Sequence, residues 1–309
     1  MNSVCVLMST YNGDKFLREQ INSILNQKSC VIKLVVRDDG SSDHTIEILE
    51  EYKQKGLLEY TKGKNVGPAK SFIELLRLAP LADYYAFCDQ DDIWKDEKLI
   101  NAIYRIERTE NENRRILYCS DLTPLVNGKP LKNNLIGNRH SNNYKTIITM
   151  CSFIFGCTIL MTKEARNLII MAPPLEEHPM HDWWCAALIS VYGTVVFDEN
   201  SFILYRQHSR NMVGANLDLK KKMKSRYDRI IGHYDRSFVS IDLMAKELLR
   251  FQDRSRMPYP DEINEFLIMV SKYKKSLINR LRLLLNIQCF FGGFKQGLFR
   301  MILLMLGRL

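Results

Sequence analysis

The sequence lacks the features that mark repeat, fibrous and disulfide-rich proteins. Glycine and proline are scarce, with 15 and 9 among 309 residues, and no period repeats along the chain. The eight cysteines include no CxxC pair, and the first ten residues enter an apolar strand pattern, so we expect no secretory leader. We therefore expect a globular protein of a reducing compartment, without a structural zinc.

Two nucleotide-binding signatures are also missing. No GxGxxG follows the first apolar run, and no GxxxxGK[ST] occurs in the chain. These absences argue against dinucleotide-binding dehydrogenases and Walker-type nucleotidases. A nucleotide would have to be held through carboxylates and a metal ion instead.

The chain does have a large apolar content and an uneven charge. Hydrophobic residues make up 46% of the sequence, which is enough for a sizeable core. Residues 1–216 carry 25 Lys and Arg against 26 Asp and Glu, a net charge of −1, whereas residues 217–309 carry 19 against 9, a net charge of +10. The basicity lies outside the first two-thirds and comes without a recognition motif, so we expect no nucleic-acid partner.

The first 110 residues alternate short β-rich runs with helical patterns. The runs predict strands at residues 4–8, 31–36, 57–61 and 84–88. This alternation is typical of an α/β fold with a doubly wound, mainly parallel sheet. Polar loops follow three of the strands, with the sequences STYNGD, DDGSSD and DQDD. Because ligands bind outside the carboxyl ends of such strands, we expect the three loops to meet at one cleft.

The DQDD loop offers ligands for a hard cation. Mg²⁺ or Mn²⁺ typically binds through one or two carboxylates together with substrate phosphates, and Asp89 and Asp91 are spaced to reach one ion. The cation would offset the charge on a departing diphosphate. Helix capping ahead of Ile93 and Trp94 is the alternative, but the buried strand pattern at residues 84–88 favours a metal.

The order and spacing of four motifs resemble the family 2 glycosyltransferases, which have a GT-A fold and use nucleotide-sugar donors. These motifs are STYNG at 9–13, DDGSSD at 38–43, NVG at 65–67 and DQDDIW at 89–94. Three later segments resemble the bacterial rhamnosyltransferases, which build cell-surface polysaccharide from dTDP-L-rhamnose. They are GCT at 156–158, HDWW at 181–184 and YRQH at 205–208. The resemblance covers roughly residues 1–215.

The resemblance implies a role for individual residues. The nucleotide-sugar site would comprise Thr10, Tyr11, Asn12, Asp39, Asp89, Gln90 and Asp91. Within it, Asp91 and Asp89 would hold the metal, with Asp91 the more direct ligand, and Asp39 could accept a hydrogen bond from a pyrimidine N3–H. The catalytic base would be Asp182. The donor sugar or the acceptor would contact Asp92, Trp94, Trp183, Trp184, Arg206 and His208.

Some of these roles have alternatives. One of the two tryptophans at 183 and 184 could be a core residue, and His208 could be a hydrogen-bonding loop residue. The family often has Glu-Asp where this chain has His181 and Asp182, so the role of His181 stays open.

Together these roles predict an inverting, metal-dependent glycosyltransferase. It would transfer L-rhamnose from dTDP-β-L-rhamnose to a saccharide or lipid-linked acceptor in cell-wall or capsular polysaccharide synthesis. One carboxylate would take the acceptor proton while the sugar carbon passes through an oxocarbenium-like state. A UDP-hexose or UDP-N-acetylhexosamine transferase fits the first four motifs equally well. A non-catalytic nucleotide- or polysaccharide-binding module is the alternative of another class, but it would not need both Asp182 and DQDD.

We expect two regions, a catalytic domain at residues 1–215 and a basic helical extension at residues 216–309. From residue 266 onward the chain has eight Lys or Arg and no acidic residue, and its longest uncharged run, residues 283–294, is 12 residues long. A membrane-spanning helix needs about 20. We expect attachment to the anionic inner face of the cell membrane, as a cytoplasmic, peripheral protein. The alternative is a helix hairpin packed on the catalytic domain or on a second subunit of a homo-oligomer.

Overall fold

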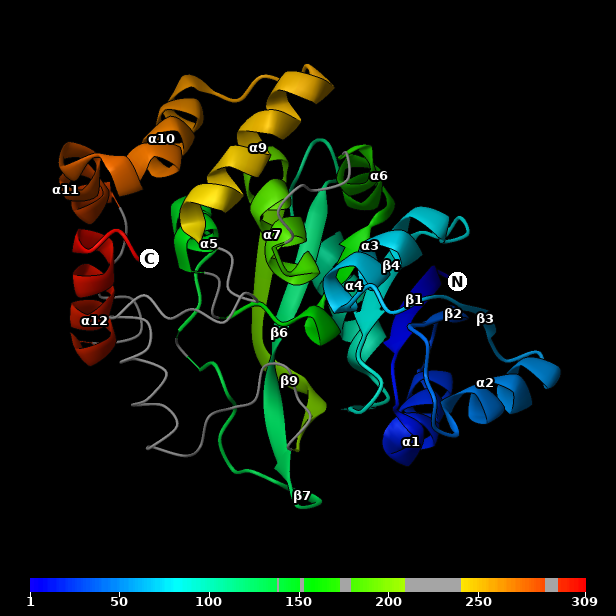
Figure 1. Ribbon diagram of the computed structural model, residues 1–309. Helices are drawn as coiled ribbons and strands as arrows, with labels where there is room; N and C mark the ends of the chain where they lie inside the picture. Colours follow the sequence, from blue (N-terminus) through cyan, green and yellow to red (C-terminus); the bar gives the residue numbers. More distant parts are fainter. Residues whose placement is uncertain (138, 151–152, 173–178, 209–239, 287–293) are drawn as a thin grey trace.

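A central sheet with helices on both faces forms the body of the computed structural model (Figure 1). The structure describes residues 1–137, 139–150, 153–172, 179–208, 240–286 and 294–309. Within these residues the strand order is β3-β2-β1-β4-β8-β6-β9-β5, and β7 pairs with β6. The predicted α/β architecture is confirmed.

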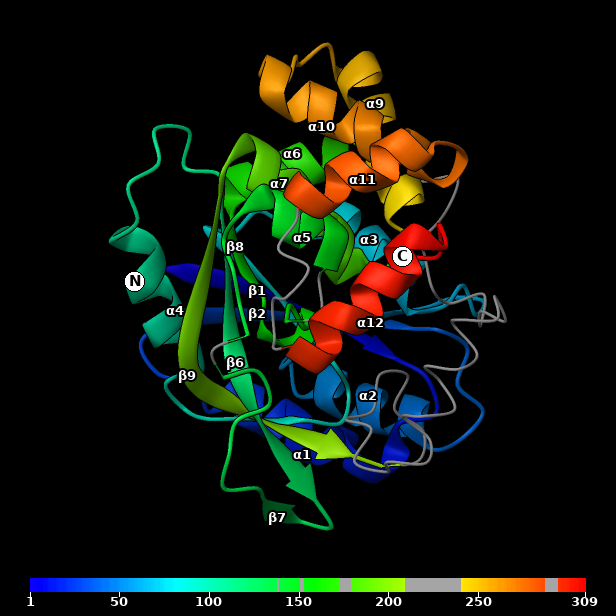
Figure 2. The ribbon, with the colours of Figure 1, turned by 90° about the vertical axis from the view of Figure 1, so that its left-hand side faces the viewer.

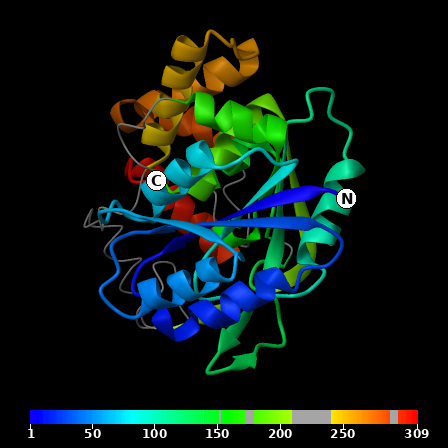
Figure 3. The same ribbon diagram turned by 90° about the vertical axis from the view of Figure 1, so that its right-hand side faces the viewer.

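The N-terminal half of the sheet is parallel. Its elements are β1 (Ser3–Thr10), α1 (Asp14–Leu25), β2 (Val31–Asp38), α2 (Thr45–Gln54), β3 (Glu59–Lys62), α3 (Pro68–Leu78) and β4 (Tyr84–Cys88). Helices α1 and α2 cover one face of these strands and α3 covers the other (Figure 3). The side chains of β4 are all buried, because a strand covered on both faces favours an unbroken apolar run.

The other half of the sheet is mixed. Strand β8 (Leu160–Thr162) runs antiparallel between β4 and β6 (Ile116–Val126), which pairs in parallel with β9 (Thr194–Gln207). Two short strands complete it, β5 (Ile93–Trp94) beside β9 and β7 (Lys129–Pro130) beside β6. The sequence pattern predicts two separate strands at 195–197 and 202–204, whereas the structure has the single strand β9. The pairing of β9 with β6 shifts register opposite residues 120–123, and these shifts let β9 continue as one strand through its polar segment at residues 198–201.

Two apolar cores lie on the two faces of the sheet. Leu17 and Ile21 of α1 and Leu99 of α4 belong to one core, and Phe72 of α3 and Trp184 of α7 belong to the other. The remaining elements of this part are α4 (Lys98–Glu107), α5 (Tyr144–Met150), the single turn η1 (Gly156–Thr158), α6 (Lys163–Met171) and α7 (His181–Tyr192). Helix α7 is apolar around most of its surface, because it lies between the sheet and the C-terminal helices.

The described C-terminal residues are helical. They form α9 (Ile241–Ser255), α10 (Asp261–Lys272), the turn η2 (Tyr273–Lys275), α11 (Leu277–Asn286) and α12 (Phe294–Met305), which lie together at one side of the molecule (Figure 2). Leu248 of α9 and Leu267 of α10 share the core that contains Trp184. The expected boundary at residues 215 and 216 lies outside the described residues. No described helix is both long and apolar enough to cross a membrane.

Candidate active site

Gln90 ties the loop after β4 to the loop after β1. Its side-chain Oε1 accepts a hydrogen bond from the Tyr11 backbone N–H at 2.9 Å, and its Nε2 donates to the Tyr11 carbonyl at 3.1 Å. A Cβ on Gly13 would lie 2.2 Å from that Oε1 atom, so only glycine allows this approach. The predicted meeting of the first and third polar loops is therefore confirmed. Both polar atoms of the Gln90 amide are used in hydrogen bonds between these loops.

The loop after β2 joins them through a buried carboxylate. Asp38 accepts hydrogen bonds from the backbone N–H groups of Gly40 and Ser41, at 3.0 and 2.9 Å, and from the Thr10 hydroxyl at 3.1 Å. On the other side, Asn12 Oδ1 accepts from the Ser42 backbone N–H at 2.8 Å. Thr10 and Asn12 thus hold the loop after β1 against the loop after β2, while the Tyr11 side chain is 49% exposed beside them.

Asp39 connects the loop after β2 to residues 65–67. It forms an ion pair with Arg37 and accepts hydrogen bonds from the backbone N–H groups of Val66 and Gly67 at 3.0 and 2.8 Å. Gly67 has φ +79°, a conformation that residues with a side chain rarely adopt. The carboxylate is 3% exposed and already holds three partners. Its predicted contact with a pyrimidine base stays a prediction.

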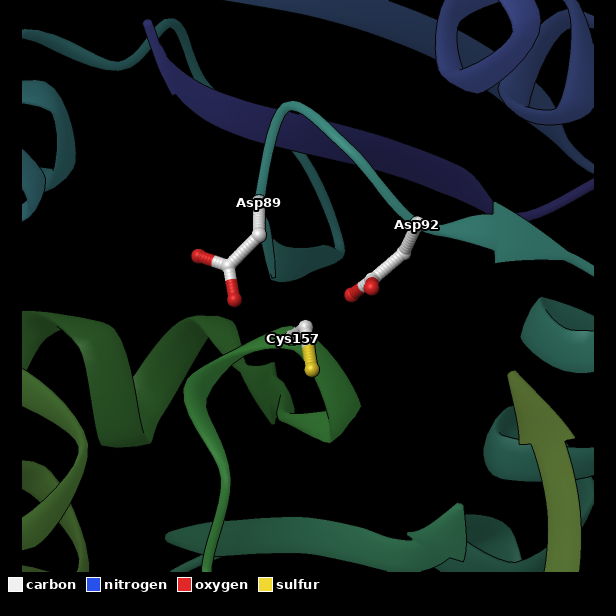
Figure 4. Close-up of side chains that lie close together, drawn as sticks. All are labelled: Asp89, Asp92 and Cys157. Atoms are coloured by element: carbon white, nitrogen blue, oxygen red, sulfur yellow. The ribbon is translucent and has the colours of Figure 1, made fainter. Parts of the chain in front are cut away.

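A cluster of donor atoms lies where the loop after β4 meets η1. One oxygen each of Asp89 and Asp92 and the sulfur of Cys157 lie within 4.8 Å of one another, and Figure 4 shows the three side chains close together. Asp92 Oδ1 accepts a hydrogen bond from the Arg206 backbone N–H at 3.0 Å. Asp92 Oδ2 is buried and has no hydrogen-bond partner among the described residues.

The charges of this cluster are poorly balanced. Burial, followed by the nearby charges of Asp91 and Asp182, raises the pKa of Asp89 to about 7. Burial, followed by the charges of Asp89 and Asp91, raises the pKa of Asp92 well above its usual value. Buried acids that repel one another are stabilised by a cation. The residues therefore fit a divalent metal ion, as the sequence predicts.

Asp91 points to a different partner. Its Oδ2 lies 2.7 Å from His208 Nε2, and the His208 ring stacks on Phe16 with 5.5 Å between ring centroids. Arg206 reinforces this arrangement, because its Nε donates to the Asp91 carbonyl at 2.8 Å and its guanidinium pairs with Glu19. The structure thus groups Asp89 with Asp92 and Asp91 with His208, whereas the sequence predicts Asp89 and Asp91 as the pair of ligands.

Asp182 lies in the first turn of α7, beside the same cluster. It accepts hydrogen bonds from the backbone N–H groups of Trp183, at 2.7 Å, and Gly156, at 3.2 Å. Burial raises the pKa of Asp182 to about 6, although these two N–H groups act against the rise. The charge of Asp182 in turn raises the pKa of Asp89, so the predicted base and a predicted metal ligand face one site.

His181 packs beneath this site. Its ring stacks on Phe72 at 4.1 Å and meets the edge of Phe87 at 5.0 Å, measured between centroids. Burial lowers the pKa of His181 to about 3, so the ring is neutral. A Cβ on Gly156 would lie 2.6 Å from its Nε2 atom. His181 therefore supports the backbone that holds Asp182, which accounts for a residue whose role the sequence left open.

Two of the predicted sugar contacts need correction. Trp94 is 2% exposed and Trp184 is 1% exposed, and each belongs to one of the two cores. Neither ring has a face free for a sugar, so Trp184 is the core residue of its pair. Trp183 is half-buried, with its indole N–H donating to the Ile147 carbonyl at 2.9 Å, and its sugar contact stays a prediction.

Three residues of the site were not assigned from the sequence. Arg37 pairs with both Asp39 and Glu74, and Cys157 completes the donor cluster. Lys98 is 2% exposed, with its ammonium 3.7 Å from the Trp94 ring centroid. Burial lowers the pKa of Lys98 to about 8, although the nearby Cys88, Cys157 and Asp92 oppose the change. A single lysine next to a helical apolar pattern gives no sign that it is buried.

Comparisons with known proteins bear on the family and the fold of the chain. Glycosyl transferase family 2 matches residues 5–158. The chain is 30% identical over 238 residues to the dTDP-rhamnosyl transferase RfbG of Shigella flexneri, which covers 70% of this chain and 77% of the relative. Two solved structures share the fold. Residues 1–349 of S. aureus TarS in complex with UDP-GlcNAc match with a TM-score of 0.53 and 15% identity, over 98% of this chain and 89% of that one. GalNAc-T7 with UDP, GalNAc and Mn²⁺ matches with a TM-score of 0.55 and 11% identity, over 82% and 55%.

Proposed function

Since the chain belongs to glycosyl transferase family 2 and has the GT-A fold, we propose that this glycosyltransferase moves L-rhamnose from dTDP-β-L-rhamnose to a saccharide acceptor in cell-wall or capsular polysaccharide synthesis. The observation that carries the proposal is the position of Asp182, which accepts a hydrogen bond from Gly156, the residue before Cys157 of the cluster that contains Asp89 and Asp92. A base and the residues for a donor diphosphate would therefore lie together. Similarity to the Shigella dTDP-rhamnosyl transferase supports the choice of sugar.

Asp182 would act as the base. Its carboxylate would accept the proton of the acceptor hydroxyl as that oxygen attacks the sugar carbon from the side opposite the diphosphate, which inverts the configuration. A β-linked donor would then give an α-L-rhamnoside. The backbone N–H groups of Trp183 and Gly156 hold the carboxylate in place. A base with a pKa near 6 is largely ionised at neutral pH and ready to accept a proton.

The loops would hold the rest of the donor. Thr10, Tyr11, Asn12 and Asp39 would surround the nucleoside, and Gln90 holds the loop after β1 against the acid loop. A divalent cation at Asp89 and Asp91, with Asp92 and His208 adjoining, would offset the negative charge of the departing diphosphate. Arg206 fixes the orientation of the acid loop through the Asp91 carbonyl and the Asp92 carboxylate.

Release of nucleoside diphosphate from a panel of sugar nucleotides tests the choice of donor. With a lipid-linked acceptor present, we expect kcat/KM for dTDP-L-rhamnose to exceed that for UDP-glucose or UDP-N-acetylglucosamine by at least about tenfold, since pocket contacts give discrimination of this size. Preference for a UDP-sugar would replace the rhamnosyl proposal by a UDP-hexose or UDP-N-acetylhexosamine transferase. Binding of nucleotide sugars without any turnover would favour the non-catalytic module.

We further propose that residues 216–309 form a region that places the enzyme on an anionic membrane surface. Helix α11 carries four apolar side chains that are between 49% and 89% exposed, namely Leu277, Ile278, Leu281 and Leu285. Helix α12 packs beside it, and Leu298, Ile302 and Leu306, the last of which follows the helix directly, are 41% to 47% exposed. Arg282 of α11 is exposed beside these side chains, and each basic residue near an anionic leaflet contributes about 1 kcal/mol.

Substitution of the exposed leucines tests the membrane proposal without cutting a helix. The double variant L281E/L285E should lose most of its cosedimentation with anionic liposomes, because it replaces apolar contact with charge repulsion. L78E, at an equally exposed position on α3, serves as the matched control and should still sediment. Unchanged sedimentation of the double variant would remove the membrane proposal, and dissociation of a dimer instead would identify this surface as a subunit contact.

A further inference from the structure

Arg37 is a buried arginine near the end of β2, and the proposed mechanism gives it no role. It is 8% exposed, and arginine is rarely buried to this extent unless it is paired. Its guanidinium forms ion pairs with Asp39 and, through Nε, with Glu74 of α3 at 2.8 Å. Its Nη2 donates a hydrogen bond to the Lys64 carbonyl at 3.3 Å. One side chain thus connects β2, the loop after β3 at residues 63–67, and α3.

Gly63 makes room for this guanidinium. A Cβ at position 63 would lie 2.6 Å from Arg37 Nη2, closer than non-bonded atoms approach one another. The Gly63 N–H donates a hydrogen bond to the Asp38 carbonyl at 2.9 Å, which holds the loop after β3 against the end of β2. The position of the guanidinium is therefore fixed by the backbone as well as by its two ion pairs.

Asp39 has little hydrogen-bonding capacity left for a ligand. A carboxylate offers about four acceptor positions. Arg37 and the backbone N–H groups of Val66 and Gly67 use three of them, which leaves about one. Because Asp39 is only 3% exposed, the orientation of its carboxylate decides whether the remaining position can reach a ligand.

Arg37 also supplies the positive charge for two carboxylates, those of Asp39 and Glu74. Removal of one member of a buried ion pair leaves the other charge uncompensated. The Glu74 side chain is 45% exposed and can be solvated, whereas Asp39 is buried. Loss of Arg37 would therefore act mainly on Asp39, by releasing its carboxylate from the present orientation.

We propose that Arg37 is a positioning residue for the nucleoside end of the donor, because it holds Asp39 in the orientation that leaves an acceptor position for an N–H group of the base. Uracil and thymine carry such a group at N3, whereas N3 of cytosine is itself an acceptor. The site would thus select uracil or thymine nucleotides with the help of an arginine that does not touch them. The inference rests on the proposed function for the presence of a nucleotide-sugar donor, and the identity of the sugar does not enter it.

Nucleotide binding tests this role without the sugar. The affinities of the full-length protein for dTDP and dCDP are measured by calorimetry in the presence of Mg²⁺. We expect the wild type to bind dTDP at least about tenfold more tightly than dCDP, because a site built to hydrogen-bond one ligand rejects an analogue that lacks the donor. R37Q should weaken dTDP binding by about tenfold or more and nearly abolish the preference for dTDP. With the donor that the wild type turns over, R37Q should raise KM while kcat changes little, since Arg37 does not contact the reacting atoms.

R166Q is the matched control. Arg166 is also a buried arginine, 7% exposed, and its guanidinium donates to the Leu76 and Ala79 carbonyls at the other end of α3. This variant should keep the wild-type preference for dTDP. An equal loss of preference in R166Q and R37Q would mean a general loosening of the fold and would overturn the inference.

A second variant covers the case in which R37Q does not fold, as judged by circular dichroism. G63A then replaces it, because the added methyl group displaces the guanidinium while the charge is kept. A wild type without a preference for dTDP, or a folded variant with unchanged dTDP affinity and preference, would overturn this inference alone. A wild type that binds neither dTDP nor UDP would overturn the proposed function as well.

Discussion

Replacing Asp182 by asparagine is expected to lower kcat by roughly 10²-fold or more, about 2.7 kcal/mol in activation free energy, while donor binding changes little. Asparagine keeps the shape and can accept one of the two backbone hydrogen bonds, which reach different carboxylate oxygens, but it cannot take the acceptor proton. Steady-state kinetics with calorimetry of donor binding separates the two effects. A variant that loses donor affinity and keeps kcat would make Asp182 a binding residue.

The pH dependence gives an independent signature. Burial raises the pKa of Asp182 to about 6, so the carboxyl is protonated below this pH and activity should rise as the pH increases through 6. The residual activity of D182N should lack this limb. D261N, an exposed aspartate in the first turn of α10, is the matched control and should keep both the rate and the pH profile.

The D182N substitution should not unfold the protein. A carboxyl whose pKa is higher in the folded state than in the unfolded chain stabilises the fold most at low pH, and this contribution is lost as the pH rises through the folded pKa of about 6. Asparagine is neutral throughout but can accept only one of the two backbone hydrogen bonds, so the Tm of D182N at pH 7 should change by no more than a few degrees. A large drop in Tm would mean that the carboxylate is structural.

Chelation should abolish turnover, and Mg²⁺ or Mn²⁺ should restore it, because the acids of the DQDD loop would otherwise repel the donor diphosphate. D91N should be nearly inactive and should remain folded, since Asp91 pairs with His208 at the edge of the site and lies outside both apolar cores. Its activity is measured with EDTA and with added metal. D96N changes an exposed carboxylate that pairs with Lys28 and should behave like the wild type. Full activity in excess EDTA would contradict the metal assignment.

The half of the fold built from local patterns could be predicted from the sequence. The strand at Tyr84–Cys88 is apolar without interruption, and polar turn residues follow it directly, so its end and the loop beyond it were both evident. The same logic located Asp89 and Asp91. Strand β8 was not evident, because an apolar run broken by Gly156 does not reveal that it inserts antiparallel between β4 and β6.

The parts of the site that could not be predicted depend on tertiary contacts. The burial of Lys98 follows from the position of α4 against the sheet, and its helical spacing gives no sign of this. Asp92 and Cys157 are 65 positions apart, and only the passage of the chain through β6 and back through η1 brings their side chains together. The sequence also could not tell which of Trp183 and Trp184 is the core residue. Neighbouring positions on a helix face different surroundings, and only Trp184 is fully buried.

The return of β9 to the acid loop affects the order in which the protein can assemble during synthesis. The strands up to β4 contact one another through short crossovers, so this half can form as soon as it leaves the ribosome, as N-terminal segments generally do. The acid loop, however, receives Arg206 and His208 only after β9 has been translated and paired with β6. A nascent chain that stops before residue 208 would hold the nucleotide loops but would leave its carboxylates without their partners. Catalytic competence would therefore be acquired late, after β9 has paired with β6 and β5.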